Sequence, residues 1–487
     1  MNDIIASLML LGAIGSGDGY LPYWATTNQW GLMPERDGGL AMVQVYQPYK
    51  TIGSSTFEWQ WGGSIAGNVY DNPLAPDSGK TNVMVDQLYA SLRWKCLSID
   101  LGQKHRELDF MASDPSLGSL SVTGGHVAES GNARPMPGYQ INLDPLAIPF
   151  TGKHLWVYGA YGDFATTDTR YVQDALVHRT RVMLRGDVGR FSIHAGLDHY
   201  AIWAGTSPEY GKQPFSFIDY IRVVTGSHAG SSGTISDQVN VIGDQGGGEL
   251  IRLDYHGNGF NVTFQHDIPY SDGSGMGFQN FPDGINTLWF GFKDKDRWVS
   301  DIVFEHHYTM YQSGPFNGET IGENGEILTP KGVKTTGGDN YFANGQYKSS
   351  WTHHGRLIAD PLCLPLGTHD GTWSSALMNM GIENTRYKAL HLGLSGKFFR
   401  KHPYRLMLTR SMNHGTYGPP YAGESAWDKE WGTVDEIGLK QWSGALTGSV
   451  LLSVRGLSVI YGLYFDKGEL YEDQIGATLG IRYSIGK

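Results

Sequence analysis

The C-terminal part of the chain carries its clearest pattern, a regular alternation of apolar and small polar positions. Along 441–454 one face is small and polar, whereas the other consists of glycines and Trp442, Leu446, Val450, Leu452 and Val454. The same alternation returns in 457–465 and in 475–485. Because a period of two places successive side chains on opposite faces, the pattern predicts three consecutive β-strands.

These predicted strands are long, at roughly ten residues each, whereas soluble proteins favour about 5–6. A tilted strand needs about 9–11 residues to cross a bilayer. The polar faces carry too little charge for a surface in bulk water but suit a crowded barrel lumen. The competing interpretation is a large soluble β-sandwich or propeller, and the absence of a repeat of about 20–50 residues counts against the propeller.

Short and long connections alternate further upstream. Tight turns are legible at 93–96, 185–190, 256–259, 293–297, 400–403 and 454–456, and long connections at 113–137, 206–248, 271–284, 312–385 and 417–439. With 20–30 counted as a strand, we predict an all-β fold: a transmembrane antiparallel β-barrel of about 18 strands (16–20). We expect loops or the N-terminal segment to occlude the lumen, and the loops 206–248, 312–385 and 417–439 to be extracellular.

Composition agrees with a barrel and excludes other classes. The chain of 487 residues has 67 Gly, 14 Trp, 27 Tyr and 19 Phe, only 17% charged residues and a mean hydropathy of −0.30. Its longest apolar run, 4–14, is shorter than the ~20 residues of a membrane-spanning helix. A net charge of −11 and the lack of a Lys/Arg block argue against a nucleic-acid partner.

The N-terminal residues 1–18 resemble an export signal without its positive start, since an apolar stretch is followed by Gly15, Ser16 and Gly17. We interpret 1–18 as a signal-peptide remnant or an N-terminal plug segment, and 19–487 as a single barrel domain. Cys96 and Cys363 are expected to be free thiols, although a disulfide between them stays open.

Catalytic and metal-binding motifs are weak in this chain. His306 and His307 occupy successive strand positions and so point to opposite faces, and His353 and His354 have no Cys or carboxylate at a familiar ligand spacing. Neither a Gly-x-Ser-x-Gly elbow nor a His-Glu-x-x-His helix is present. We therefore expect a non-enzymatic protein with no metal and no cofactor, and expect the strand histidines to line a polar lumen or the aqueous boundary.

Carbohydrate binding suits the long connections better, because sugars present apolar C–H faces beside many hydroxyls. Aromatic rings flanked by polar side chains form three candidate groups: Trp203, Tyr210 and Asp219; Trp351, His353 and Arg356; and Trp427 with Trp431. Arg134 and Arg222 are expected to anchor folded-in loops. Aromatic residues at strand ends also form the interfacial girdles of membrane barrels, so girdle or loop packing is the competing interpretation for each ring.

Several short segments of the chain are distinctive. They are Tyr-Trp-Ala-Thr-Thr-Asn-Gln-Trp-Gly at 23–31, Asn-Ala-Arg-Pro-Met-Pro at 132–137, Trp-Ala-Gly at 203–205 with the stretch 214–222, and the stretch 341–362. Together these segments resemble the capsule-assembly Wzi-like outer-membrane proteins, in their Bacteroidetes branch. The resemblance implies an occluded outer-membrane barrel of a Gram-negative bacterium, associated with capsular or other surface polysaccharide. Enterobacterial members act as lectins and carry a helical bundle before the barrel, for which this chain lacks room.

Three functions stay open at this point. The first is a non-catalytic barrel that binds or assembles surface polysaccharide. The second is a porin-like or gated solute channel, which the polar stripe containing Ser443, Thr447 and Arg482 would serve equally well. The third is a scaffold subunit with outer-membrane protein partners. The identity of the glycan or solute and the oligomeric state do not follow from the sequence.

Overall fold

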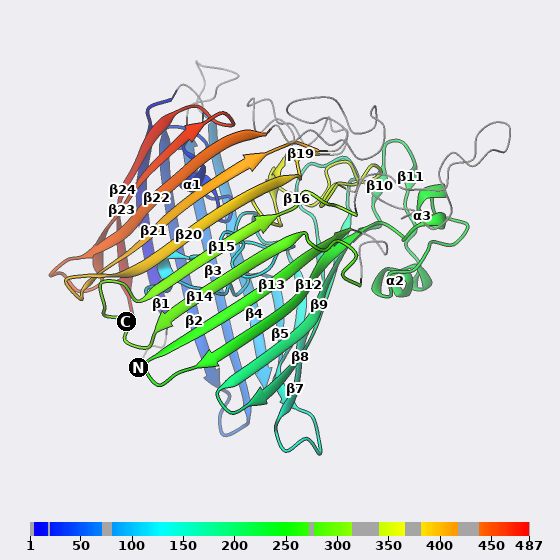
Figure 1. Ribbon diagram of the computed structural model, residues 1–487, viewed down its shortest axis with the longest axis horizontal. Helices are drawn as coiled ribbons and strands as arrows, with labels where there is room; N and C mark the ends of the chain where they lie inside the picture. The colour runs from blue at the N-terminus through cyan, green and yellow to red at the C-terminus, as the bar shows by residue number, and fades with distance from the viewer. Residues whose placement is uncertain are drawn as a thin grey trace.

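Eighteen strands form one closed antiparallel sheet, in which each strand pairs with the next along the chain and the last pairs with the first (Figure 1). The structure is a computed structural model and describes residues 4–17, 20–70, 80–271, 277–313, 340–365, 381–416 and 438–486. The wall strands are β1 (Ile5–Gly15), β2 (Gly38–Thr51), β3 (Phe57–Tyr70), β4 (Lys80–Trp94), β5 (Leu97–Gln103), β6 (Gly138–Ala147), β7 (Leu155–Ala165), β8 (Leu176–Val188), β9 (Phe191–Trp203), β12 (Asp244–His256), β13 (Phe260–Ser271), β14 (Gly284–Phe292), β15 (Asp301–Tyr308), β20 (Tyr387–Phe398), β21 (His402–Asn413), β22 (Leu439–Leu451), β23 (Leu457–Gly468) and β24 (Gln474–Ile485). The predicted antiparallel barrel of about 18 strands is confirmed.

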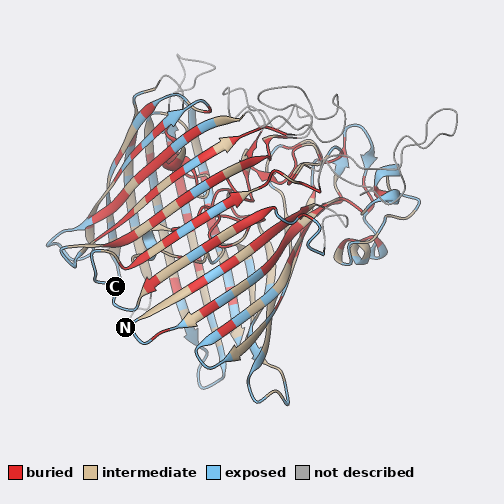
Figure 2. Ribbon diagram, viewed as in Figure 1, coloured by how far each residue is buried: buried red, intermediate tan, exposed pale blue. Residues whose placement is uncertain are grey.

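The alternation that predicted the strands becomes an alternation of exposure around the wall (Figure 2). In β24 the apolar Ile475, Leu479 and Ile481 are exposed outward, whereas Gln474 and Thr478 are buried inside. An outward apolar face of this kind is the surface that a membrane barrel presents to lipid.

The two ends of the barrel differ in the length of their connections. Short turns at 95–96, 189–190, 257–259 and 399–401 lie at the end that also holds the start of β1 and the end of β24. Connections 16–37, 104–137, 204–243 and 309–386 leave from the opposite end. We call these the short-turn end and the loop end.

Two expectations for the N-terminal region are wrong. Residues Ile5–Gly15 do not form a plug segment but make wall strand β1, which pairs with β2 and with β24. Its inner side chains Met9 and Leu11 pack on an apolar core, so both of its faces are apolar and the alternation is hidden. Residues 20–30 do not form a strand, because they enter the lumen and include the short helix α1 (Tyr23–Thr26).

The interior of the barrel is filled by three connections that fold inward, 20–37, 104–137 and 340–365, which we call the plug. Their apolar side chains pack with inward wall residues into one core that contains Trp24, Val127, Tyr341, Trp351 and Tyr200. The connection 104–137 also reaches far toward the short-turn end, where Ser113 N donates to Ser395 Oγ over 2.8 Å. The predicted occlusion of the lumen by loops is therefore confirmed.

Within the described ranges, no helix has the length and apolar character required to cross a membrane.

Candidate functional site in the barrel lumen

Buried carboxylates of the wall hold the plug by its backbone. Glu305 on β15 accepts hydrogen bonds from Ser121 Oγ (2.6 Å) and Val122 N (2.8 Å), and Asp267 on β13 accepts one from Val127 N (2.7 Å). Both carboxylates are almost completely buried. A carboxylate that accepts backbone N–H groups in a buried setting forms a strong charge-assisted bond, so these contacts fix the position of the plug.

A second anchor couples a wall histidine to the connection 340–365. His307 Nδ1 lies 2.8 Å from Asp360 Oδ2 and its Nε2 lies 3.4 Å from Glu305 Oε2. Tyr387 O–H also donates to Asp360 Oδ2, over 2.7 Å. Across the described residues, no group of three or more His, Cys, Asp or Glu side chains is arranged to hold a metal ion.

Glu129 of the plug is the centre of a buried ion-pair array on β8 and β9. Its Oε2 lies 2.6 Å from Arg179 Nη2 and accepts the Tyr200 hydroxyl over 2.5 Å, while its Oε1 contacts Arg106. One carboxylate of the plug thus faces two guanidinium groups and a phenol, one guanidinium coming from the plug and one from the wall.

The array continues along the wall through a bidentate pair. Arg181 Nε and Nη2 donate to the two oxygens of Asp198, over 2.5 and 2.6 Å. His126 Nδ1 lies 3.5 Å from Asp198, but burial, reinforced by the charge of Arg181, lowers the pKa of His126 to about 3. His126 is therefore neutral at physiological pH, and the charge of Asp198 is balanced by arginine.

Toward the short-turn end the paired charges become partly exposed. Arg252 Nη1 lies 2.9 Å from Asp109 Oδ2 and its Nε lies 3.0 Å from Asp254 Oδ2. His194 Nε2 lies 3.1 Å from Oδ2 of the same Asp254, and its Nδ1 lies 2.7 Å from the Tyr158 hydroxyl oxygen. The side chain of Asp109 is 42% exposed, so solvent reaches this part of the lumen.

Aromatic rings lie beside these half-exposed charges. The Arg252 guanidinium lies 5.7 Å from the centre of the Phe110 ring, and that of Arg185 lies 5.8 Å from Trp156. Arg185 also pairs with Asp187 over 2.7 Å. Aromatic faces together with exchangeable donors and acceptors are the groups that bind the C–H faces and hydroxyls of sugars. We call the set Asp109, Phe110, Trp156, Tyr158, Arg185, Asp187, His194, Arg252 and Asp254 the lumen chamber.

The lumen chamber was not predicted from the sequence, because ligand contacts were expected in the long connections. A signal was present, since β8 carries arginine at positions 179, 181 and 185, which all fall on one face of a strand. Three arginines on the inward face of one strand indicate a lumen lined by charged side chains.

Four predicted site residues come together in the plug. Trp351 is 5% exposed, donates through Nε1 to the carbonyl of Ala128 over 2.9 Å and packs edge-on against Tyr200. His353 Nδ1 bonds the carbonyl of Arg134 over 2.8 Å, and burial lowers the pKa of His353 to about 4. Arg356 pairs in the backbone with His353, through β17 (Arg356–Leu357) and β16 (Thr352–His353). These contacts pack the loop and leave no open aromatic platform at Trp351.

The other four are Trp203, the last residue of β9, and Tyr210, Asp219 and Arg222 in the connection 204–243. Trp203 is 4% exposed and stacks on Phe215 with ring centres 5.5 Å apart. Asp219 and Arg222 form an ion pair of 2.8 Å, and Tyr210 is half exposed nearby in sequence. Trp427 and Trp431 lie outside the described residues.

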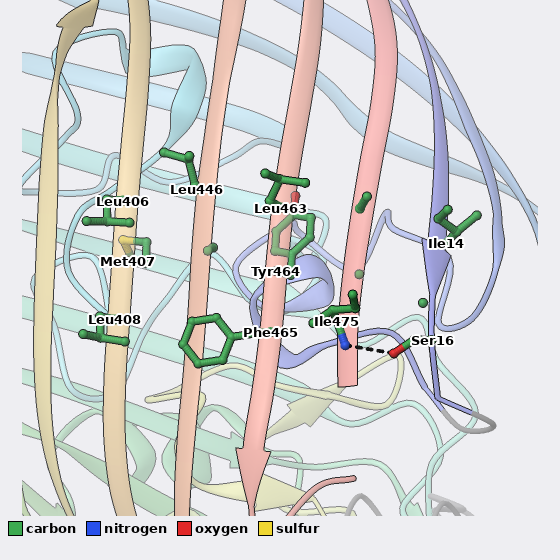
Figure 3. A pocket seen from close by; sticks show the side chains of 14 residues that line it. Ile14, Ser16, Leu406, Met407, Leu408, Leu446, Leu463, Tyr464, Phe465 and Ile475 are labelled. Atoms are coloured by element: carbon green, nitrogen blue, oxygen red, sulfur yellow. Dashed lines mark hydrogen bonds between the residues drawn. The ribbon is translucent and has the colours of Figure 1, made fainter. Parts of the chain in front are cut away.

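An apolar groove of about 600 Å³ lies on the wall where β21, β22, β23, β24 and the end of β1 meet (Figure 3). Leu463 and Ile475 in its lining are exposed outward, and Ile475 N donates to Ser16 Oγ over 3.0 Å. Its lining is almost entirely apolar, so it suits hydrocarbon and offers little to a polar ligand.

Solved structures of outer-membrane β-barrels share the fold of this chain. It is similar to Wzi of Escherichia coli, described as an outer-membrane protein involved in group 1 capsule assembly and a carbohydrate-binding β-barrel, with a TM-score of 0.52 and 11% identity over 98% of this chain and 83% of that one. OccK3 of Pseudomonas aeruginosa (TM-score 0.46, 11% identity, 99% and 96% coverage) and OccAB4 of Acinetobacter baumannii (TM-score 0.45, 8% identity, 99% and 98% coverage) also match. No family model and no curated protein matches the chain.

The fold and its contents define the class of protein. The chain is a closed antiparallel β-barrel of eighteen strands with the fold of outer-membrane barrels, and its lumen is plugged by its own connections. At these identities the structural likeness extends to the fold, so membership of the Wzi-like family stays a prediction from the sequence.

Proposed function

We propose that this protein is a non-catalytic outer-membrane barrel of a Gram-negative bacterium that binds or assembles surface polysaccharide. The filled lumen is the observation that carries the proposal. Plug and wall share a continuous apolar core and buried carboxylate anchors, an arrangement that favours a fixed binding scaffold over a wide solute path. The similarity in fold to Wzi, a carbohydrate-binding barrel, supports the same assignment.

The lumen chamber is the proposed site of contact with the polysaccharide. Trp156 offers a partly exposed ring, and Arg185, Arg252 and Asp254 offer donors and acceptors. The polysaccharide hydroxyls would exchange with the hydrogen bonds that these side chains make to one another and to water. Because each arginine keeps a carboxylate partner, the chamber suits a hydrated, weakly charged chain better than a strong polyanion.

The test is binding of purified capsular polysaccharide from the source bacterium to the full chain in nanodiscs, measured by calorimetry. We expect Trp156→Ala and Arg252→Ala to weaken binding at least tenfold, and Arg190→Ala, an exposed arginine in the short turn 189–190, to leave it unchanged. Absence of binding by the native chain, together with an unchanged capsule in a deletion strain, would refute the proposal.

A solute channel is the second candidate, and the half-exposed charges of the lumen chamber favour it. Planar-bilayer recording separates the two functions, because a steady open-pore current through the native chain contradicts a plugged binding barrel. A scaffold within a larger outer-membrane assembly would instead show as a stable protein partner on purification.

A further inference from the structure

Helix α2 (Phe217–Val224) lies on the outer side of the barrel wall at the loop end of β7, β8 and β9 (Figure 1). The parity of the strands shows which face it covers. In β9, Phe191 and Ile193 are exposed outward, so Trp203 of the same parity also faces outward. Trp203 nevertheless is buried, because Phe215 and Tyr220 cover it.

The wall beneath α2 is polar where an outward face is normally apolar. Asp163 on β7 lies an even number of positions from the outward-facing Leu155, and His178 on β8 lies an even number from the outward-facing Val182, so both face outward. Their side chains lie 2.9 Å apart. Tyr220 of α2 donates to Asp163 Oδ2 over 2.7 Å. Helix α2 therefore shields polar groups that a lipid-facing wall could not leave bare.

The opposite face of α2 is apolar and uncovered. Phe217 is 78% exposed, Ile218 63% and Ile221 45%, and Phe215 just before the helix is 60% exposed. The helix is held in this orientation by a capping box between Ser216 and Asp219 and by burial of Val223 against the wall. Such a face costs free energy in water, and large exposed apolar patches mark interaction sites.

We propose that α2 is an interfacial helix whose outer face inserts into the acyl-chain boundary of the outer leaflet. Two observations point to lipid as the occupant. The apolar face of α2 continues the outward apolar stripe of Val182 and Leu184 on β8, replacing it where the wall turns polar. The aromatic rings of Trp203, Phe215 and Tyr220 also cluster at this level, as rings do in the girdle at a membrane interface.

This inference goes beyond the proposed polysaccharide binding and does not depend on it. The role of α2 is to extend the lipid contact of the barrel and to hold the connection 204–243 against the membrane.

The test uses a fluorescent probe on single cysteines in the full chain, reconstituted in phosphatidylcholine vesicles. The background carries Cys96→Ser and keeps the buried Cys363. Probes are placed through Ile218→Cys on α2, Val182→Cys on the lipid-facing wall and Lys153→Cys in an exposed short turn. Brominated phosphatidylcholine quenches probes in the bilayer, and iodide quenches probes in water.

We expect the Ile218 probe to be quenched by brominated lipid at least half as strongly as the Val182 probe, and by iodide several-fold less than the Lys153 probe. An Ile218 probe that follows Lys153 in both measurements overturns the inference and would leave a protein partner as the occupant. All three positions point away from the plug, and heat-modifiable electrophoretic mobility verifies that each variant forms the barrel. Polysaccharide binding by the same variants reports separately on the proposed function.

Discussion

Replacing Glu129 with alanine should loosen the plug without opening the wall. Glu129 belongs to the connection 104–137, whereas two of its partners, Arg179 and Tyr200, belong to the wall. In Glu129→Ala, the buried guanidinium groups of Arg179 and Arg106 lose their shared counter-charge and the Tyr200 hydroxyl loses its acceptor.

The size of the effect follows from burial. The side chains of Glu129 and Arg179 are only 4% and 6% exposed, and removing one partner of such a buried pair costs about 3–5 kcal/mol. Arg106 is 18% exposed and can recover some hydration, so the lower value of about 3 kcal/mol is appropriate. Because about 1.4 kcal/mol corresponds to a factor of ten, the plug should open roughly 100-fold more often.

Hydrogen exchange measured by mass spectrometry reports this opening peptide by peptide. In Glu129→Ala, amides of 104–137 should exchange about 100-fold faster, while those of the wall strands keep their native rates. Glu107→Ala is the matched control, because Glu107 is an exposed carboxylate in the same connection. Exchange rates in 104–137 that match between the two variants and the native chain would refute the role of Glu129 as an anchor.

Three further predictions concern the plug. Trp24→Ala, which removes a ring that is 2% exposed, should destabilise docking of 20–37 by about 3–5 kcal/mol, seen as loss of near-ultraviolet circular dichroism and faster exchange there. Burial lowers the pKa of His353 from 6.5 to about 4, so the neutral form stabilises docking of 340–365 above pH 6.5, and this stability is lost as the pH falls toward 4. Hydrogen exchange in 340–365 should therefore become faster between pH 6.5 and 4, and His353→Gln should reduce this increase. Gly393→Ala places a Cβ 2.3 Å from the carbonyl oxygen of Leu120 and should displace the plug at a cost of about 1–3 kcal/mol. Gly63→Ala is the control, because its Cβ meets only ordinary van der Waals contacts. Equal melting curves for the two variants would contradict the prediction.

The wall was predictable because lipid contact imposes a period of two on every strand that has a polar inner face. The pattern failed at Ile5–Gly15, where the inner face packs on the apolar plug and both faces read alike. It failed again at 20–30, where aromatic residues resembled a strand but serve the core around α1. Local pattern therefore identifies a strand only where its two faces meet different surroundings.

The lumen was less predictable because its pairs depend on register between distant segments. Arg179 and Glu129 are 50 positions apart, and nothing local to either residue indicates that they meet. Trp203 and Trp351 were interpreted as candidate sugar platforms, but the structure buries both in loop packing. The sequence around an aromatic residue in a long connection does not indicate whether that connection projects into solvent or folds back on the wall.

The seam between β1 and β24 has a consequence for biogenesis. It pairs Ala6 with Ile485 and Gly15 with Gly476, so the ring is closed by the first and the last strands of the chain. Until the final strand arrives, β1 and β23 each present an unpaired row of backbone groups, which invites aggregation. The carboxylate anchors of the plug lie on strands in the middle of the chain, so they can form before the seam closes. The sheet becomes a closed ring only when β1 and β24 pair, so neither strand is protected at both edges until this seam has formed.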